Sequence, residues 1–161
     1  MLIEAYGTPA PQGSKKVFGR TKLGRTIMAE TSDKVTPWRA DVMTAARHAI
    51  AEYNQLYPIG WQPLAGAVQA RMVFSFNRPV SVKRHKRPYH SVAPDLSKLA
   101  RSTEDALQAA GVLFDDCLIV EYTRLAKVYC CEDPEALDVP GVLIVVLPLL
   151  DLVPVGDTPR R

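Results

Sequence analysis

A segment of alternating apolar and polar residues restricts the fold more than any other feature of this chain. Between residues 66 and 77 apolar side chains take every second position: Val68, Ala70, Met72, Phe74 and Phe76. Polar residues, among them Gln69, Arg71, Ser75 and Asn77, stand between them. Because successive side chains of a strand point to opposite faces, the segment predicts a strand with one buried and one exposed face.

Three more segments predict strands. Residues 2–6 form a short candidate that ends at Gly7. Residues 117–129 are rich in β-branched and aromatic side chains, which favour strands. Residues 141–147, GVLIVVL, are continuously apolar, so we expect both faces of that strand to be covered.

Two helices are predicted between these strands. Thr36 can cap the first helix, Pro37 suits its first helical position, and the helix should end near residues 54–57. Its apolar stripe comprises Trp38, Val42, Ala45, Ala49 and Tyr53. The second helix should cover about residues 96–110 and end at Gly111. Its inner face comprises Leu99, Ala100, Thr103, Ala106, Leu107 and Ala110.

The order of these elements predicts an α/β (α+β) fold. We expect a small mixed sheet of about four strands, with two main helices packed against one face. A chain of 161 residues has room for one hydrophobic core. We therefore expect a single domain over residues 1–150 and a flexible C-terminal tail over residues 151–161.

The same sequence gives no sign of a membrane or secretory segment. The longest apolar run, residues 142–153, is interrupted by Pro148 and Asp151 and is too short for a membrane-spanning helix. The N-terminus, MLIEAYG, does not resemble a signal peptide. The three cysteines form no CxxC pair, so we expect reduced, partly buried thiols. These features together predict a cytoplasmic protein without membrane partners.

Positive charge is concentrated in two segments that we expect to be loops, although the net charge is only +3. The first segment, residues 11–35, has room for a hairpin and contains Lys15, Lys16, Arg20, Lys22 and Arg25. The second, residues 78–94, contains Lys83, Arg84, His85, Lys86 and Arg87. Like charges at this density repel one another unless a polyanion neutralises them, so the segments predict contacts with a nucleic-acid backbone. The alternative is two solvated loops.

The residues able to perform chemistry lie in residues 94–116, PDLSKLARSTEDALQAAGVLFDD. Asp95 opens the second helix, and Asp115 and Asp116 follow its far end. A helix of this length extends about 20 Å, so Asp95 and Asp116 meet only under one of two conditions. Either the next strand runs back along the helix, or a second subunit contributes. The alternative reading is structural, with the acids serving as helix caps and turn residues.

This run resembles the signature of the RusA family of Holliday junction resolvases, the crossover junction endodeoxyribonucleases. In that signature an Asp-x-Asp at a helix start is followed by a lysine, then Asp-Ala-Leu, Gly and Asp-Asp. Asp95, the Asp-Ala-Leu at residues 105–107, Gly111 and the Asp-Asp at residues 115–116 match it. The N-terminal GTPAPQGSKK is also similar to the family's opening segment. Two positions differ, with Ser97 in place of the second acid and Arg101 in place of the lysine.

The resemblance implies a Mg²⁺-dependent endonuclease that acts as a homodimer on four-way DNA junctions in recombination and repair. Asp95 and Asp116 would hold one or two Mg²⁺, with Ser97 at a weakened ligand position and Asp115 nearby. Arg101 and Lys127 would neutralise charge on the phosphate.

Two spacings bear on this assignment. Ser97, Arg101 and Asp105 share one helix face by their spacing. The even separation of Glu121 and Lys127 places them on one side of a strand, unless a bulge intervenes.

Two other functions stay open at this level. Ser97 removes a ligand, which favours a junction-binding protein of the same fold with impaired catalysis. A nuclease that prefers flaps or forks also fits the same residues. An assay with a synthetic four-way junction, with and without Mg²⁺, separates these alternatives.

Overall fold

The computed structural model describes residues 1–13, 15–20, 26–30 and 33–149. The elements in chain order are β1 (Leu2–Tyr6), β2 (Lys15–Arg20), β3 (Thr26–Glu30), α1 (Val35–Leu56), β4 (Val68–Phe76), α2 (Leu96–Ala110), the 3₁₀ turn η1 (Asp116–Leu118), β5 (Ile119–Tyr129) and β6 (Gly141–Pro148). The tail expected at residues 151–161 lies outside the described residues.

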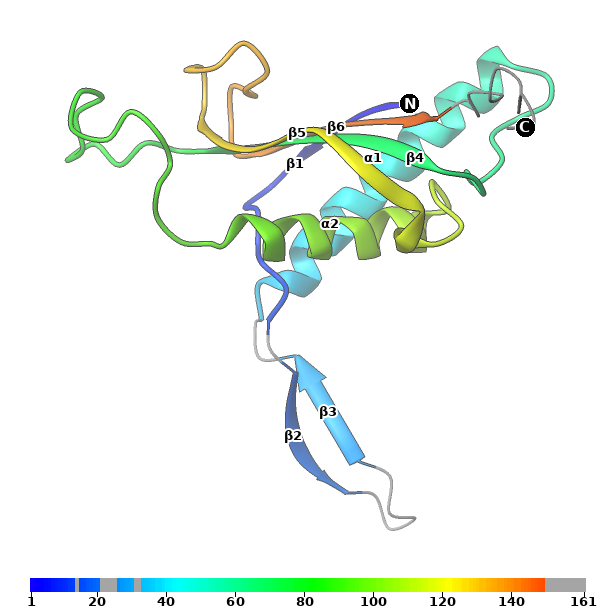
Figure 1. Ribbon diagram of the computed structural model, residues 1–161, viewed down its shortest axis with the longest axis horizontal. Coiled ribbons are helices and arrows are strands. Elements are labelled where there is room, and N and C mark those ends of the chain that lie inside the picture. Colours follow the sequence, from blue (N-terminus) through cyan, green and yellow to red (C-terminus); the bar gives the residue numbers. More distant parts are fainter. Residues whose placement is uncertain (14, 21–25, 31–32, 150–161) are drawn as a thin grey trace, which may run out of the picture.

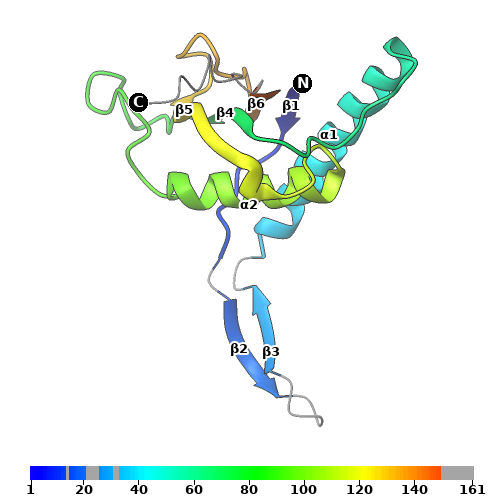
Figure 2. The same cartoon turned by 45° about the vertical axis from the view of Figure 1, so that its right-hand side comes forward.

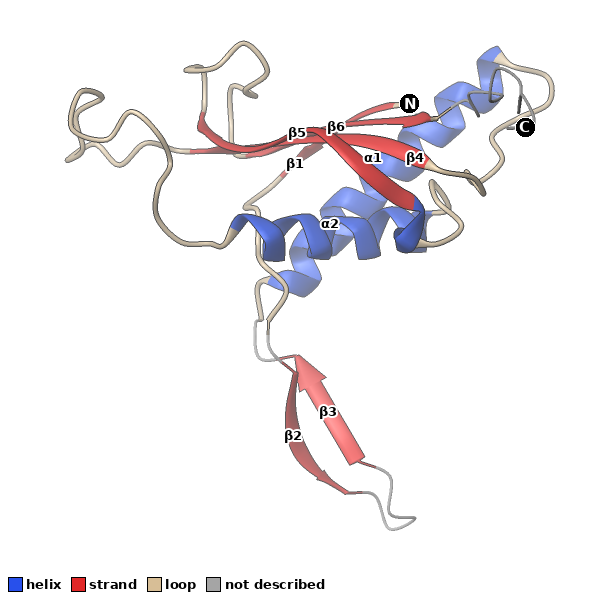
Figure 3. Cartoon of the chain, viewed as in Figure 1, coloured by secondary structure: helices blue, strands red, loops and turns tan. Residues whose placement is uncertain are grey.

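The main sheet has four strands in the order β1-β6-β4-β5. β6 runs antiparallel to both of its neighbours, whereas β5 runs parallel to β4. Parallel strands need a crossover, and α2 provides it. Both α1 and α2 lie on one face of the sheet, and among the described residues the other face carries no helix (Figures 1 and 3). This arrangement confirms the predicted mixed sheet with two helices on one face.

The hydrophobic core lies between the sheet and the two helices. The predicted inward residues of β4 from Val68 to Phe74 are buried, and Phe76 packs against the core. Ser75 was expected on the exposed face, but it is fully buried. Its Oγ accepts a hydrogen bond from the amide of Leu137 at 2.9 Å, because the loop after β5 covers this end of β4.

The prediction that both faces of β6 are covered was wrong. Val142, Ile144 and Val146 are completely buried beneath the helices. Leu143 and Val145 are only partly buried, and Leu147 is 45% exposed. The reason is that both helices pack on the same face, which leaves the alternate side chains of a central strand without a covering layer.

The ends of α2 agree with the sequence prediction, whereas the start of α1 does not. Gly111 ends α2 in the left-handed region with φ 82°, and its amide donates to the carbonyl of Gln108. α1 begins at Val35 with Lys34 in the cap position, so Thr36 lies in the first turn and is not the cap. The first turn therefore starts two residues earlier than the Thr-Pro pair indicated.

β2 and β3 form a two-stranded hairpin that stands away from the main sheet (Figures 1 and 2). β2 and β3 pair antiparallel with a register shift between Val17 and Gly19. Three of the predicted DNA contacts, Lys15, Lys16 and Arg20, belong to β2. Lys22 and Arg25 lie outside the described residues.

Two remaining expectations concern membranes and thiols. Within the described ranges, neither α1 nor α2 combines the length and apolar character needed to cross a membrane. All three cysteines are free. Cys117 and Cys131 are exposed, which corrects the expectation of partly buried thiols, and only Cys130 is intermediate.

Candidate active site

The outer face of α2 forms one wall of the candidate site. Ser97, Arg101 and Glu104 follow one another at steps of four and three residues, so they lie on the same side of the helix. Ser97 and Arg101 are exposed and Glu104 is partly buried. The opposite side of α2, which includes Leu99 and Leu107, is buried in the core.

We expected Asp105 on this outer face. Its carboxylate is instead engaged in contacts with α1 and with the N-terminal segment. Its carboxylate forms an ion pair with Arg39 of α1 and accepts a hydrogen bond from Gln12 Nε2 at 3.2 Å. Nearby, Ser102 Oγ donates to the carbonyl of Ala10 at 2.7 Å. These bonds attach the N-terminal segment and α1 to α2.

β5 does run back along α2, and it brings Lys127 to the start of the helix. Lys127 Nζ donates to the carbonyls of Val92 and Pro94 at 2.6 and 2.7 Å. Burial lowers the pKa of Lys127, and the nearby carboxylate of Asp95 opposes that shift. Asp95 Oδ2 also lies 3.4 Å from Lys98 Nζ. The surroundings of Asp95 are therefore cationic.

Asp116 is placed beside a different part of α2. It is the first residue of η1, which packs against α2. From the adjoining strand, Tyr122 Oη donates a hydrogen bond to Glu104 Oε1. Burial raises the pKa of Glu104, and the negative charge of Asp116 raises it further, while the Tyr122 hydrogen bond and Arg101 oppose the shift. Asp116 and Glu104 thus form an acidic centre.

Two register shifts in β5 decide which side chains reach these centres. The shifts fall between Val68 and Gln69 and between Ala70 and Arg71 of the partner strand β4. Tyr122 then pairs with Ala70 and Lys127 with Phe74, so both side chains face the helices. Glu121 pairs with Gln69 and is exposed on the open face. The second shift, after Tyr122, therefore separates Glu121 from Lys127, which the even spacing had placed on one side.

Asp115 orients the turn that carries Asp116. Its Oδ1 accepts a hydrogen bond from the amide of Cys117 at 2.9 Å. Hydrogen bonds from Cys117 lower the pKa of Asp115, so this carboxyl group keeps its charge. The residue acts here as a cap for η1.

Glu104 and Tyr122 were not singled out from the sequence. A signal for Glu104 was present, because it follows Ser97 by seven residues and an α-helix repeats its face at that spacing. Tyr122 carried no such signal. Regular alternation along β5 does not reveal its side, which depends on the bulges.

The basic segment before α2 is anchored to the body of the protein by Arg78. Its guanidinium binds Glu132 through two nitrogens at 2.6 and 2.8 Å and lies 3.7 Å from the centre of the Tyr129 ring. It also donates to the carbonyl of Arg87 at 2.7 Å. Beyond this anchor, Lys83, Arg84 and Lys86 are exposed, while Arg87 is partly buried.

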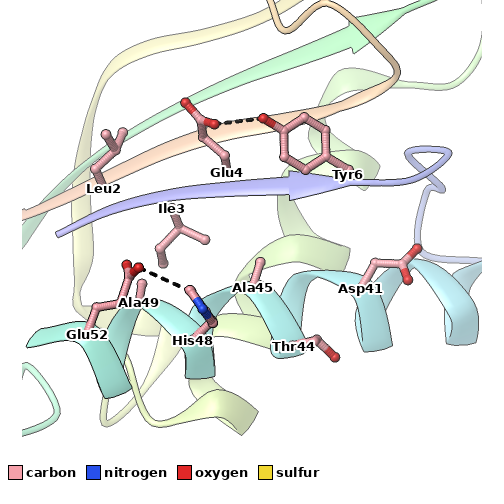
Figure 4. Close-up of a pocket in the computed structure, with 10 residues that line it drawn as sticks. All are labelled: Leu2, Ile3, Glu4, Tyr6, Asp41, Thr44, Ala45, His48, Ala49 and Glu52. Atoms are coloured by element: carbon pink, nitrogen blue, oxygen red, sulfur yellow. Dashed lines mark hydrogen bonds and ion pairs between the residues drawn. The ribbon is translucent and has the colours of Figure 1, made fainter. Parts of the chain in front are cut away.

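A cavity of about 710 Å³ lies elsewhere, between β1 and α1 (Figure 4). Its polar contacts are a hydrogen bond from Tyr6 to Glu4 at 2.8 Å and a pair between His48 and Glu52 at 3.6 Å. Glu4, Glu52 and Asp41 give the lining a negative character. That charge disfavours a phosphodiester, so the candidate active site remains the α2–β5 region.

Both walls of the α2–β5 region carry groups that suit phosphate chemistry. No group of three or more His, Cys, Asp or Glu side chains gathers as a ready metal centre in the part of the chain that the structure describes. Glu104 and Asp116 nevertheless provide carboxylate oxygens, and both are open to solvent in part. Mg²⁺ is usually bound by one or two carboxylates and keeps several waters, so this donor set fits the ion.

Comparison with protein-family models and with curated proteins gave two results. Residues 7–136 match the family model described as endodeoxyribonuclease RusA. No curated protein matches the chain. The matched range includes α1, β4, α2, η1 and β5, and therefore every residue of the candidate site.

Proposed function

Because the chain belongs to the RusA family of endodeoxyribonucleases, we propose that it is a Mg²⁺-dependent resolvase of four-way DNA junctions in recombination and repair. Family membership makes the protein an endodeoxyribonuclease, and the family acts on Holliday junctions. The dependence on Mg²⁺, the role in repair, the homodimeric state and a cytoplasmic location are the parts that we propose.

The observation that carries this proposal is the pairing of two oppositely charged centres along α2. Lys98 and Lys127 surround Asp95 at the start of the helix, directly after the basic segment. Glu104 and Asp116 form the acidic centre further along. Hydrolysis of a phosphodiester needs cations for the phosphate and carboxylates for a metal ion, and this face offers both.

Each side chain receives a proposed task from its contacts. We assign Asp116 as a metal ligand in the acidic centre. Asp95, beside Lys98 and Lys127 at the start of the helix, would hold a second ion at a separate point of the same face, with Ser97 able only to orient a metal-bound water. When bound, Mg²⁺ supplies an activated water and stabilises charge on the phosphate oxygens. Arg101 is exposed and can grip a phosphate with two hydrogen bonds.

Lys127 and Asp115 act mainly by positioning in this proposal. The bonds of Lys127 to Val92 and Pro94 hold the chain that leads into Asp95. Asp115 holds Asp116 in place by capping η1.

The basic segments supply affinity in this proposal. Contacts from residues 83–87 and from the first basic segment neutralise backbone phosphates, which carry no base sequence. Recognition of a junction must then come from its shape. A four-way junction has two-fold symmetry, so a two-fold homodimer presents one site to each of two strands.

The test is cleavage of a synthetic four-way junction with and without Mg²⁺. We expect wild type to cut only with Mg²⁺, and Asp116→Asn to lose cutting while it keeps junction binding, because the basic segments are unchanged. Glu52→Gln, on the exposed side of α1, is the matched control and should cut like wild type.

Two results would replace the proposal by its alternatives. A wild type that binds junctions tightly but cuts none at any Mg²⁺ concentration would show a junction-binding protein with impaired catalysis. Faster cutting of flaps or forks than of junctions would show a nuclease for those structures.

A further inference from the structure

We infer that His90 is a positioning residue whose uncharged ring holds the basic segment, residues 78–94, against the sheet. The inference rests on the proposed function, which gives this segment the task of binding DNA. It assigns a task to a side chain that the proposed mechanism does not use, and it makes the placement of the segment depend on pH.

His90 is the point at which the basic segment enters the core. Within residues 78–94, all of which the structure describes, it is the only buried residue. Its ring stacks on Phe76 of β4, with 4.3 Å between the ring centres and 23° between the ring planes. The ring centre of Tyr129 in β5 lies 5.3 Å away. Because Phe76 and Tyr129 are partners in the pairing of β4 with β5, His90 attaches the segment to two adjacent strands.

This attachment also places the chain that leads into α2. Lys127, two residues before Tyr129 in β5, donates to the carbonyl of Val92 at 2.6 Å and to that of Pro94 at 2.7 Å. These carbonyls follow His90 by two and four residues. His90 and Lys127 thus fix consecutive parts of the chain, and together they set where the basic side chains lie relative to the start of α2.

The charged groups around the imidazole are mainly cations. The guanidinium carbon of Arg78, just after β4, lies 3.7 Å from the centre of the Tyr129 ring, and Arg78 donates to the carbonyl of Arg87 at 2.7 Å. Lys127 approaches from β5. The nearby acid, Glu132 in the loop after β5, is bound by two nitrogens of Arg78, so its charge is already balanced.

A protonated imidazole does not fit these surroundings. Nδ1 of His90 is buried and has no hydrogen-bond partner in the part of the chain that the structure describes. An imidazolium donates from both ring nitrogens, so protonation would leave a buried donor unpaired. Burial lowers the pKa of His90, and the positive charges of Lys127 and Arg87 lower it further. The neutral ring is therefore the form that stays in place.

The sign of the pH effect follows from the lowered pKa. A released ring titrates near the ordinary histidine value, about 6.5, and the attached ring titrates below it. The stabilisation of the attached form is therefore present above about pH 6.5 and is lost as pH falls through the pKa of the attached ring. Each unit of difference between the two pKa values weakens the attachment by about tenfold.

The experiment follows the protein by NMR without DNA, from about pH 7.5 to about pH 5. In wild type we expect His90 to titrate below the ordinary histidine midpoint, and the amide signal of Val92 to change with the same midpoint. His90→Phe keeps an aromatic ring against Phe76 but cannot be protonated, so this transition should vanish. His48→Phe, at an exposed position of α1, is the matched control and should keep the transition. Thermal unfolding at neutral pH checks each variant, and His90→Leu is a second uncharged replacement if His90→Phe does not fold.

Binding to a synthetic four-way junction without Mg²⁺ gives the functional readout. Acidification should weaken binding by wild type relative to His90→Phe by about threefold or more, the effect of half a unit of pKa difference. His48 and His85 are present in both proteins, so any protonation of these two side chains cancels in the ratio.

A segment that does not change with pH in wild type, or that changes with the same midpoint in His90→Phe, would overturn the inference. Junction cleavage keeps this result separate from the proposed function. If the segment follows the titration of His90 but wild type cuts no junction, the positioning role stands and the proposed function fails. If wild type cuts junctions with Mg²⁺ while the segment does not respond to His90, the positioning role alone fails.

Discussion

Ser97 and Arg101 change the chemistry at the start of α2 relative to the signature that the rest of the segment matches. The serine hydroxyl is a weak ligand for Mg²⁺, which prefers carboxylates and water. The guanidinium of Arg101 retains the positive charge of the lysine and adds two-point binding of a phosphate. Both side chains are exposed on one helix face, so a substitution at either position leaves the core intact.

Ser97→Asp should raise Mg²⁺-dependent cleavage and lower the Mg²⁺ concentration needed for the half-maximal rate. A negative charge in the first turn suits the positive end of the helix dipole, so the fold should tolerate the change. The measurement is the rate of junction cleavage against Mg²⁺ concentration. Ser97→Asn, which has a similar shape without the charge, is the matched control. A variant that cuts no faster at any concentration, beside a fully active wild type, would show that residue 97 is not a ligand position.

At the scale of elements, arginines hold two loops that lie beside β5. The two loops differ in the charged side chains that they expose to solvent. Arg124 binds Asp133 at 2.6 Å and also pairs with Glu135, which fixes the loop between β5 and β6. Arg78 fixes the base of the basic segment through Glu132. In the first loop Asp133 and Glu135 are thereby paired, whereas the second loop presents Lys83 and Lys86 to solvent.

The contribution of Arg124 to stability should depend on pH. Its guanidinium holds the pKa of Asp133 and of Glu135 below their usual values. Lowered carboxyl pKa values stabilise the fold above the unfolded values, about 3.9 and 4.3, and this stabilisation is lost as pH falls through the folded values. Arg124→Met should therefore reduce the free energy of unfolding most at neutral pH and least near pH 3, measured by denaturant unfolding at each pH.

Arg47→Met, at an exposed position of α1, is the control for loss of one surface arginine. A deficit of Arg124→Met that is equally large at neutral and acidic pH would show that lost packing, and not charge pairing, explains the effect.

Neutralising the basic segment should weaken binding to every form of DNA. Replacing Lys83, Arg84, Lys86 and Arg87 together tests the whole segment, but Arg84 lies 3.4 Å from Glu132 and Arg87 is partly buried. Lys83→Gln with Lys86→Gln is the cleaner pair. Each lost phosphate contact should reduce the slope of log affinity against log salt by about 0.9 on duplex DNA.

Filter binding or fluorescence anisotropy over a salt series measures that slope. Arg47→Gln on α1 provides a matched loss of surface charge outside the segment. A slope that stays unchanged in the Lys83 and Lys86 double variant would mean that the segment is only a solvated loop.

At the scale of the whole molecule, one core joins the four-stranded sheet to both helices, and the hairpin stands apart from it. This is compatible with the single domain that we propose for residues 1–150. The candidate site occupies one side of that core, so a single chain presents one set of site residues. Paired cuts in a symmetric junction then require a second chain.

We expect the protein in solution to have twice the chain mass of 17.8 kDa, measured by light scattering after size exclusion. We also expect both strands of a junction to be nicked within the lifetime of one complex, because the two sites act on one substrate. A junction in supercoiled circular DNA distinguishes the outcomes, since coupled nicks give linear product and independent nicks accumulate nicked circles. A monomer at all concentrations with uncoupled nicks would contradict the dimer.

The sequence by itself determined the local features of this protein. Periodicity and a glycine placed α2 at residues 96–110 and ended it at Gly111, as observed. Alternation identified β4 and its buried face. The signature at residues 94–116 identified the family that the comparison confirms. These features succeed because helix ends, strand faces and short motifs depend on residues that are near one another in the chain.

Only the tertiary structure decided which side chains meet. The pairing of β5 with β4 introduced the bulges that turn Tyr122 toward Glu104 and Glu121 away from it. Packing of α1 against α2 pairs Asp105 with Arg39, whereas the adjacent Glu104 accepts a hydrogen bond from Tyr122. The exposed face of β6 and the burial of Ser75 are likewise set by which segments pack against each face of the sheet. Each depends on contacts between segments far apart in sequence, which local periodicity does not encode.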